Sequence, residues 1–350
     1  MHRKENKTEK CLVCITAQLR AKELTWENFK KFVLDQLKAD LALCIGVDKN
    51  TSRKNKFYQY AKYIWEYDDP KDYTDAYNYA KEALKSEEDW RILLKIKGIW
   101  LGGIKGEGAQ PSGSAIGMFY KWLLKQKLIE HKLISKYDRF IVTRSDFFYC
   151  APHPPLELLA SDKIWIPRGE NYGGCGDRHL IASSKDIIKC INLLDDIILR
   201  PKELYRKMCF HQSWNAEQYL ALHLRENDLK DRVRRFPRVM FLVRGEKDDT
   251  RWSQGEYNNK LNLIVRYRKE FIESKYHSKV IKNNDDWKRI LRTPLAIKNL
   301  IISTLLCFMA CKLYSFKVIM NKKFPKLTIV LRKIKRYLTR VKNKYNDLLA

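Results

Sequence analysis

Apolar runs of strand length alternate with helical patterns near the start of the chain. Cys11–Ala17 is a short apolar run bounded by charged and polar residues, which is typical of a buried strand. Thr25–Lys38 carries its large apolar side chains at helical spacing, and Asp40–Val47 returns to the strand-like pattern. Strand, helix and strand at this spacing predict a βαβ unit. The expected fold class is therefore α/β, with a mostly parallel sheet flanked by helices and ligands at the carboxyl ends of its strands.

The same alternation continues along the chain, interrupted by two glycine-rich loops, Gly98–Ser114 and Gly169–His179. Glycine lets a backbone approach a ligand closely, so Lys105 and the helix start that follows are suited to a phosphate. A flexible surface loop is the alternative for this segment. Further helices are expected at residues 73–84, 90–96, 115–128, 185–199 and 215–224, and further strands at residues 140–142 and 163–167.

The positive charge of the chain is extreme and unevenly distributed. The formal net charge is +28, which favours an anionic partner: nucleic acid, anionic lipid or a phosphate-bearing substrate. Sixteen Lys or Arg residues and no acid occur from Lys288 to Asn346, so more than half of the net charge belongs to the C-terminal segment. The C-terminal segment therefore needs its own explanation.

The C-terminal segment has the pattern of basic amphipathic helices. Asn299–Cys311 is free of charge but, at thirteen residues, short of the roughly 20 that a transmembrane helix needs. From Leu327 to Leu348 apolar residues recur at helical spacing among lysines and arginines. Such a helix lies in a membrane interface with its cations near anionic headgroups. The alternative is a helix that docks on its own domain and leaves a solvated basic face.

Nine cysteines are scattered through the chain without a disulfide-like spacing. No signal-peptide pattern precedes them, because the first ten residues are polar and charged. We expect reduced thiols and a cytosolic setting. Cys11 and Cys14 lie inside an apolar strand pattern, so we interpret them as buried core residues in preference to a redox pair or half a zinc site.

Arg144-Ser145-Asp146 follows the apolar strand pattern at residues 140–142. At the carboxyl end of a strand, a carboxylate can hold Mg²⁺ or Mn²⁺ against a diphosphate, and an arginine can bind phosphate oxygens. A divalent ion there would stabilise the charge on a departing nucleoside diphosphate. The alternative is an aspartate that caps the turn after the strand.

Three polar segments resemble a group of bacterial and large-algal-virus glycosyltransferase-like proteins, similar in style to the WavE family of lipopolysaccharide synthesis. The segments are Gln18-Leu19-Arg20, Arg144-Ser145-Asp146 and Tyr172–His179, and the resemblance spans about residues 11–270, including Lys97–Lys105 and Thr250–Ser253. It implies the GT-A fold, a Rossmann-like domain that binds a nucleotide sugar and usually a divalent cation.

The resemblance places Arg144-Ser145-Asp146 at the Asp-x-Asp motif of such enzymes. The first aspartate of that motif is Arg144 here, so one carboxylate plus an arginine would neutralise the diphosphate with less help from a metal, or with none. Asp146 is the expected ligand of Mn²⁺ or Mg²⁺. The expected donor-binding residues are Gln18, Arg20, Lys105, Arg144, Ser145 and Asp146.

Asp177 and Glu217 are the expected catalytic bases. Inverting transfer needs a carboxylate that takes the proton of the acceptor hydroxyl. Glu217 has a structural alternative, because an acid in the first turn of a helix favours the helix dipole. Arg178 and His179 are the expected acceptor-binding residues, although His179 could equally orient Asp177 or fill the loop.

The chain is thus expected to be a nucleotide-sugar-dependent glycosyltransferase, moving a hexosyl or pentosyl group to a surface-glycan or lipid-linked acceptor of lipopolysaccharide or capsule synthesis. It would be peripheral on the cytoplasmic face of a membrane, with no nucleic-acid partner. The expected organisation is a disordered basic N-terminus (1–10), a GT-A-like domain (11–285) and a membrane-associating helical tail (286–350). Two alternatives stay open: a nucleic-acid-binding protein, on the net charge and the Tyr/Lys-rich residues 53–81, and a non-catalytic membrane scaffold.

Overall fold

The computed structural model describes residues 9–49, 51–105, 113–169, 171–245, 248, 255–293, 302, 305 and 309. The chain divides into two compact units, Met1–Ile297 and Lys298–Ala350. Most of the second unit lies outside the described residues, and so do the predicted amphipathic helix at 327–348 and the segment Thr250–Ser253. The described elements therefore belong almost entirely to the first unit.

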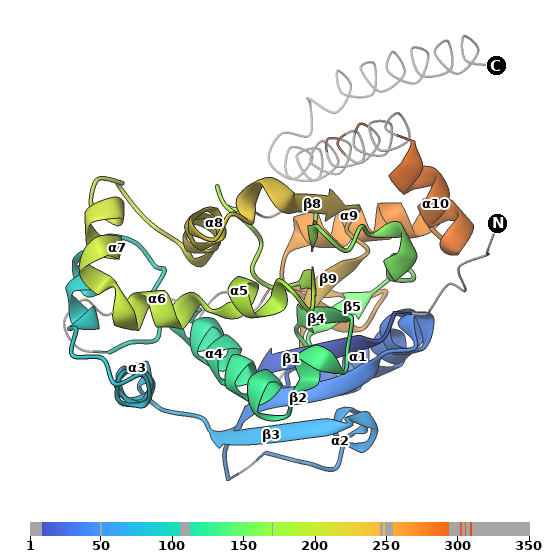
Figure 1. The fold of residues 1–350 in the computed structure, drawn as a ribbon. Coiled ribbons are helices and arrows are strands. Elements are labelled where there is room, and N and C mark those ends of the chain that lie inside the picture. The colour runs from blue at the N-terminus through green and yellow to red at the C-terminus, as the bar shows by residue number, and fades with distance from the viewer. Residues whose placement is uncertain are drawn as a thin grey trace, which may run out of the picture. The chain divides into compact units, whose positions relative to one another are not determined.

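The first unit is built on a seven-stranded sheet within the described part of the chain (Figure 1). β1 (Cys11–Ala17) is the third strand in spatial order and pairs in parallel with both of its neighbours. β7 (Leu180–Ser183) is antiparallel to β4 (Arg139–Thr143) on one side and to β6 (Ile164–Pro167) on the other, and β6 is parallel to β8 (Val233–Phe236). Within this sheet, β7 is therefore the strand that runs in the opposite direction. This order and direction confirm the predicted α/β class with a mostly parallel sheet. The strands, in spatial order, are β3 (Tyr63–Asp68), β2 (Asp40–Val47), β1 (Cys11–Ala17), β4 (Arg139–Thr143), β7 (Leu180–Ser183), β6 (Ile164–Pro167) and β8 (Val233–Phe236).

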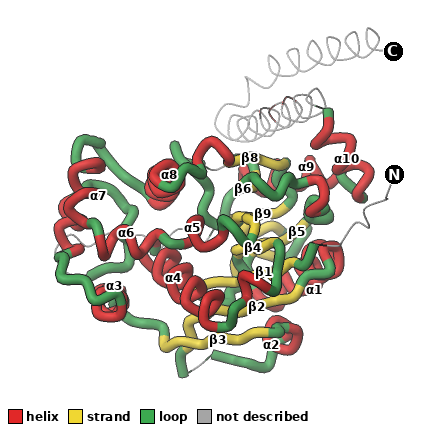
Figure 2. The backbone as a smooth tube through the Cα atoms, viewed as in Figure 1, coloured by secondary structure: helices red, strands yellow, loops and turns green. Residues whose placement is uncertain are grey.

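A second, antiparallel sheet of four short strands lies beside the end of β4 (Figure 2). The chain leaves β4 at Thr143 and enters the second sheet at Phe147, so residues 144–146 form the turn between the two sheets. Any side chain on this turn therefore lies where the large sheet ends and the small one begins. The strands, in spatial order, are β10 (Glu256–Asn258), β11 (Leu263–Val265), β9 (Met240–Arg244) and β5 (Phe147–Tyr149).

Helices cover the sheets because their apolar faces match the buried strands. α4 (Ser114–Glu130), the longest helix within the described residues, packs against β1 and β2. α1 (Lys22–Phe29) packs against β5, and α9 (Arg268–Val280) packs against β9 (Figure 1). The helices are α1 (Lys22–Phe29), α2 (Lys56–Tyr60), α3 (Tyr73–Ala83), α4 (Ser114–Glu130), α5 (Ile187–Ile191), α6 (Leu193–Leu199), α7 (Pro201–Met208), α8 (Ala216–Glu226), α9 (Arg268–Val280) and α10 (Asn284–Arg292). Short 3-10 helices occupy Trp90–Lys95, Leu133–Ser135, Leu156–Leu158 and Lys230–Arg232.

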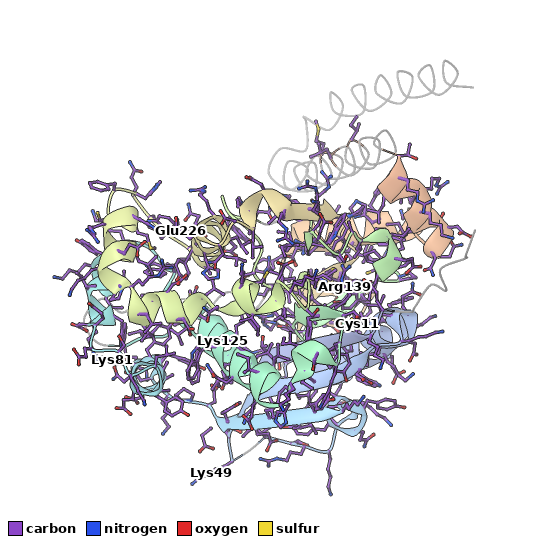
Figure 3. The ribbon with its side chains drawn as sticks, viewed as in Figure 1. Cys11, Lys49, Lys81, Lys125, Arg139 and Glu226 are labelled. Carbon is purple, nitrogen blue, oxygen red and sulfur yellow. The ribbon has the colours of Figure 1, made fainter. Side chains whose placement is uncertain are left out.

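Two helices differ from the sequence pattern. The helix expected over 25–38 is α1 followed by a π-helical turn, Lys30–Asp35, and the helix expected over 185–199 is interrupted at Asn192 between α5 and α6. Asn192 accepts a hydrogen bond from Lys125, a buried lysine of α4 labelled in Figure 3, which also pairs with Asp195 at 2.5 Å. A buried ammonium is stable only when paired, and the break in the helix supplies one of its partners.

The buried core includes the first strand and reaches α10. Cys11 and Cys14 are 2% and 0% exposed and carry free thiols, which confirms their interpretation as core residues. Trp287 on α10 is fully buried, and its indole Nε1 donates to the Pro152 carbonyl oxygen at 2.9 Å. The α/β unit therefore extends past residue 285. Among the described helices, none has both the length and the apolar character that crossing a membrane requires.

Candidate active site

A cavity of about 400 Å³ opens at the carboxyl ends of β1 and β4. Open α/β sheets bind their ligands at this edge, where the loops after neighbouring strands diverge. The loops after β1 and β4, the start of α4, the start of α8 and the turn after β11 contribute its walls. The lining residues are Thr16, Ala17, Gln18, Arg20, Ile99, Gly113, Ser114, Ile116, Gly117, Arg144, Tyr172, Asp177, Arg178, Asn215, Ala216, Glu217, Arg266 and Tyr267.

The structure brings six of the ten sequence-predicted site residues to this cavity. The lining residues among them are Gln18, Arg20, Arg144, Asp177, Arg178 and Glu217. Lys105 is exposed outside the cavity, with its backbone N–H donated to Asp72. Ser145, Asp146 and His179 are each 1% exposed and do not line it.

Ser145 connects the loops that follow β1 and β4. Its Oγ accepts a hydrogen bond from the Arg20 backbone N–H at 2.9 Å, and its carbonyl oxygen accepts one from Thr25 Oγ1 at 2.6 Å. These bonds fix the backbone of the β1 loop relative to that of the β4 loop. Ser145 therefore positions Arg20 and Arg144 without reaching the cavity itself.

The Asp146 carboxylate is enclosed by guanidinium groups. Arg144 donates to both of its oxygens, from Nε and Nη2, each at 2.8 Å, and Arg244 on β9 pairs with Oδ2 as well. Burial raises the pKa of Asp146, but Arg144 first, then Arg244 and Arg20, lower it more, so that it lies well below its usual range. Asp146 is thus a permanent anion whose oxygens already have partners.

This arrangement does not fit a divalent cation. A metal needs free carboxylate or neutral oxygen ligands, whereas the Asp146 oxygens are bound by two arginines whose positive charge would repel it. The part of the chain that the structure describes also holds no group of three His, Cys, Asp or Glu residues placed to share an ion. The expected role of Asp146 as a metal ligand therefore has no geometric support.

His179 belongs to the core and not to the cavity. Its Nδ1 lies 3.0 Å from Thr143 Oγ1, and its Nε2 lies 3.4 Å from Nε2 of the buried His153. Burial, with the neighbouring His153, lowers the pKa of His179 well below its ordinary value, so the imidazole is neutral. The expected contact of His179 with an acceptor has no geometric support in these surroundings.

The start of α8 holds Glu217 against the glycine-rich loop. Asn215 caps the helix by a reciprocal pair of hydrogen bonds with Gln218, at 2.8 and 3.0 Å. The Glu217 carbonyl oxygen accepts from the Cys175 backbone N–H at 2.9 Å, and a Cβ on Gly174 would lie 2.0 Å from that same oxygen. Glycine is therefore required at 174 for the loop to lie this close to the helix.

Glu217 and Asp177 are neighbouring carboxylates in different surroundings. Burial, and then the negative charge of Asp177, raises the pKa of Glu217 to about 7. Asp177 lies 3.7 Å from the Lys121 ammonium, which also donates to the Asp177 carbonyl oxygen at 3.0 Å. A carboxyl whose pKa is raised towards neutral is a stronger base than an ordinary glutamate, which suits Glu217 to accepting a proton.

Two lining residues hold strained backbone conformations. Ala17, the last residue of β1, has φ of 71°, and Tyr172 in the glycine-rich loop has φ of 45°. A left-handed conformation is rare in residues other than glycine and costs on the order of 1–3 kcal/mol. The Asn215 side chain holds Tyr172 by donating to its carbonyl oxygen at 3.0 Å, which leaves the tyrosine 46% exposed beside the cavity.

Sequence reasoning missed the residues that the second sheet and α4 contribute. Arg266 and Tyr267 follow β11, Arg244 ends β9, and Lys121 lies on α4. Of these residues, Lys121 alone could have been noticed in the sequence. It interrupts the apolar pattern of 115–128, and a lysine on a buried helix face needs a partner for its charge. The short strands β9 and β11 have no motif that points to a site.

Comparison with solved structures shows a structural likeness to a glycosyltransferase. No family model and no curated protein matches the chain. Among solved structures, the apo crystal structure of mouse xyloside xylosyltransferase 1 is similar over 65% of this chain and 84% of that chain, with 11% identity and a TM-score of 0.35. A likeness of this size carries no argument about activity, so the function has to be inferred from the site.

Proposed function

We propose that this chain is a glycosyltransferase that transfers a sugar from a nucleotide-sugar donor to a hydroxyl group of an acceptor. The observation that supports this most is the cavity at the carboxyl edge of β1 and β4, where guanidinium groups lie beside the Glu217 carboxyl of raised pKa. Phosphate-binding cations and a base tuned to neutral pH are the two requirements of such a transfer.

The donor occupies the cavity from the start of α4 to the arginines. Ala17, Ile99 and Ile116 provide apolar walls for a nucleoside, and Gly117 leaves open space, since an added Cβ there would meet no atom within 4 Å. Arg20 and Arg144 bind the diphosphate oxygens, which arginine does in a bidentate manner. The N-terminus of α4 adds a favourable dipole for a negative group.

Glu217 accepts the proton of the acceptor hydroxyl. As that O–H bond breaks, the oxygen forms a bond to the anomeric carbon, and the bond from that carbon to the diphosphate oxygen breaks with its electron pair. The arginines stabilise the charge that gathers on the leaving diphosphate. Asp177, held by Lys121, raises the basicity of Glu217 by its charge.

The finer assignments are part of the proposal. The transferred group is a hexosyl or pentosyl unit, and the acceptor is a surface-glycan or lipid-linked saccharide of lipopolysaccharide or capsule type. The basic amphipathic segment from 286 to 350 would keep the enzyme on the cytoplasmic face of an anionic membrane. The charge pattern of the sequence supports this attachment, because residues Lys288 to Asn346 contain sixteen lysines and arginines and no acid.

A binding screen tests the proposed function. UDP, GDP, CMP and dTDP sugars are titrated calorimetrically into the full chain, with and without Mn²⁺. We expect one donor class to bind and to lose affinity in the Arg144→Gln variant. A folded protein that binds none of these donors under either condition would contradict the proposal and leave the membrane scaffold or the nucleic-acid-binding protein to be tested.

The Asp177→Asn variant is expected to shift the pH dependence of transfer. In the unmodified chain only the deprotonated Glu217 accepts a proton, so turnover should rise with pH through about 7. Removing the negative charge of Asp177 lowers the pKa of Glu217 towards its ordinary 4.5, which moves the midpoint to lower pH. The measurement is turnover from pH 5 to 9, with the exposed Asp231→Asn as control. Complete loss of turnover in Asp177→Asn would make Asp177 the base instead.

The Gly174→Ala variant is expected to lower turnover about a hundredfold, because the added methyl group forces the loop away from the Glu217 backbone and misplaces the base. The matched control is Gly176→Ala in the same loop, where the nearest atom, Asn171 Oδ1, lies at an ordinary 3.7 Å. Steady-state kinetics and thermal unfolding of both variants check this. Equal kinetics in the two variants would show that the close approach at 174 does not hold Glu217 in place.

A further inference from the structure

The positive charge at the phosphate end of the cavity is not balanced by the acids around it. Four guanidinium groups gather where the two sheets meet, and Asp146 is the one carboxylate in ion-pair contact with any of them within the described residues. The four are Arg20, Arg144, Arg244 and Arg266. Burial, and then the charges of Arg144 and Arg244, lower the pKa of Arg20, which reflects this crowding.

Two of the arginines that line the cavity make no ion pair with a described acid, although the charges of Asp146 and Asp248 act on Arg20 from a greater distance. Arg20 donates from its side chain to Gln18 Oε1, and Arg266 lies with its guanidinium carbon 5.0 Å from the centre of the Tyr267 ring. Neither makes an ion pair within the part of the chain that the structure describes. Like charges held near one another at the edge of a protein repel more strongly than in bulk water, so this cluster favours an anion.

Buried N–H groups in the cluster lack hydrogen-bond partners. Arg244 is 0% exposed, and its Nε and Nη2 have no partner among the described residues; the same holds for the Nε of Arg266. Nearly all buried donors in folded proteins are paired, so these guanidinium N–H groups beside the cavity are free to bind a ligand. The ligand that such donors favour is an oxyanion with several acceptor oxygens.

We propose that Arg20, Arg144 and Arg266, supported by Arg244, bind the pyrophosphate group of the donor directly and take the place of a divalent cation. This inference rests on the proposed function and specifies how that site recognises its substrate. The two negative charges of a pyrophosphate diester offset most of the cluster's surplus, which is three positive charges when Asp146 is set against the four arginines. Asp146 holds Arg144 and Arg244 side by side and contributes no metal site.

Hydrogen bonds within the protein hold the arginines in place without a ligand. Ser145 Oγ binds the Arg20 backbone N–H, both Asp146 oxygens orient the Arg144 guanidinium, and the Arg266 backbone N–H donates to the Leu242 carbonyl oxygen at 2.9 Å. Three segments far apart in the sequence are thereby held around one position. Preorganised donors of this kind lose little entropy on binding and stabilise charge as it develops.

The test compares binding with and without divalent cations. UDP, GDP and inorganic pyrophosphate are titrated calorimetrically into the full chain in excess EDTA, and again in Mn²⁺ and in Mg²⁺. We expect a nucleoside diphosphate to bind in EDTA with a Kd within threefold of that in either metal. Binding at least tenfold weaker in EDTA that Mn²⁺ restores would overturn this inference and leave the proposed function standing. Binding of no nucleoside diphosphate under any condition would overturn both.

Two variants separate the cluster from general charge. Arg266→Gln should weaken binding of the nucleoside diphosphate and of pyrophosphate in EDTA roughly tenfold to a hundredfold. Its fold should be intact, because it leaves no carboxylate unpaired. The control, Arg234→Gln, removes the same charge from an exposed position on β8 and should leave the Kd unchanged. Equal affinities in the two variants would overturn the role of Arg266 and the proposed replacement of the metal.

Discussion

Glu217→Gln is expected to lower the turnover of sugar transfer by roughly a hundredfold to ten-thousandfold, the usual contribution of a positioned general base. Glutamine keeps the size and shape of the side chain but cannot accept the proton of the acceptor hydroxyl. The Kd of the donor should change little, because the guanidinium groups that bind phosphate are untouched. Turnover measured at saturating donor, with the donor Kd by calorimetry, separates the two effects.

The matched control for this variant is Glu226→Gln on the same helix. Glu226, labelled in Figure 3, lies at the other end of α8, where it pairs with Lys207 outside the cavity. Its replacement should leave turnover within about twofold of the unmodified chain, since exposed ion pairs contribute little. If Glu217→Gln retained full turnover, Glu217 would be a residue of the helix start and not the base.

Asp146→Asn is expected to destabilise the folded chain by about 3–5 kcal/mol. Removing one partner of a buried ion pair leaves the other charge buried and unpaired. Here Arg244 is fully buried, and Arg144 loses one of its two acceptor oxygens to an NH2 group. The effect on folding should therefore exceed any effect on chemistry. Urea unfolding of the variant and of the unmodified chain measures it.

Asp35→Asn provides the comparison for Asp146→Asn. Asp35 is also paired, with Lys30 at 2.8 Å, but its side chain is 55% exposed, so its loss should change the stability by no more than about 0.5 kcal/mol. Adding Arg244→Gln to Asp146→Asn should recover part of the stability, because the buried charge then disappears together with its partner. A stable Asp146→Asn variant that loses only Mn²⁺-dependent binding would show that Asp146 is a metal ligand after all.

The site depends on the meeting of two sheets. Residues 144–146 turn the chain from β4 into β5, and β9 and β11 of the small sheet bring Arg244 and Arg266 to the same place. Arg144 on the turn already donates to both Asp146 oxygens, and Arg244 of the small sheet adds a second guanidinium group at Oδ2. The small sheet therefore adds positive charge where the large sheet ends.

The sequence by itself determined the local elements and most of the large sheet. Apolar runs located β1, β2, β4 and β6 within a residue or two, and helical spacing located α3, α4 and α8, including the Asn215 cap. These patterns predict the elements well because a strand or helix that buries one face must carry apolar residues at regular spacing within a short stretch of sequence. Three of the expected site residues, Gln18, Arg20 and Arg144, line the cavity because parallel strands bring their carboxyl ends to one edge. Asp177, Arg178 and Glu217 reach it from the glycine-rich loop and from α8.

Only the tertiary structure decided the electrostatics of the site. Arg244 lies 98 residues from Asp146 in the chain, and no local pattern records that their side chains meet. The same applies to His179, whose polar surroundings in the sequence gave no sign that His153 and Thr143 enclose it. The charge and solvation of a side chain depend on every group packed around it, whichever part of the chain supplies that group, whereas hydrophobic periodicity depends on neighbours along the chain alone.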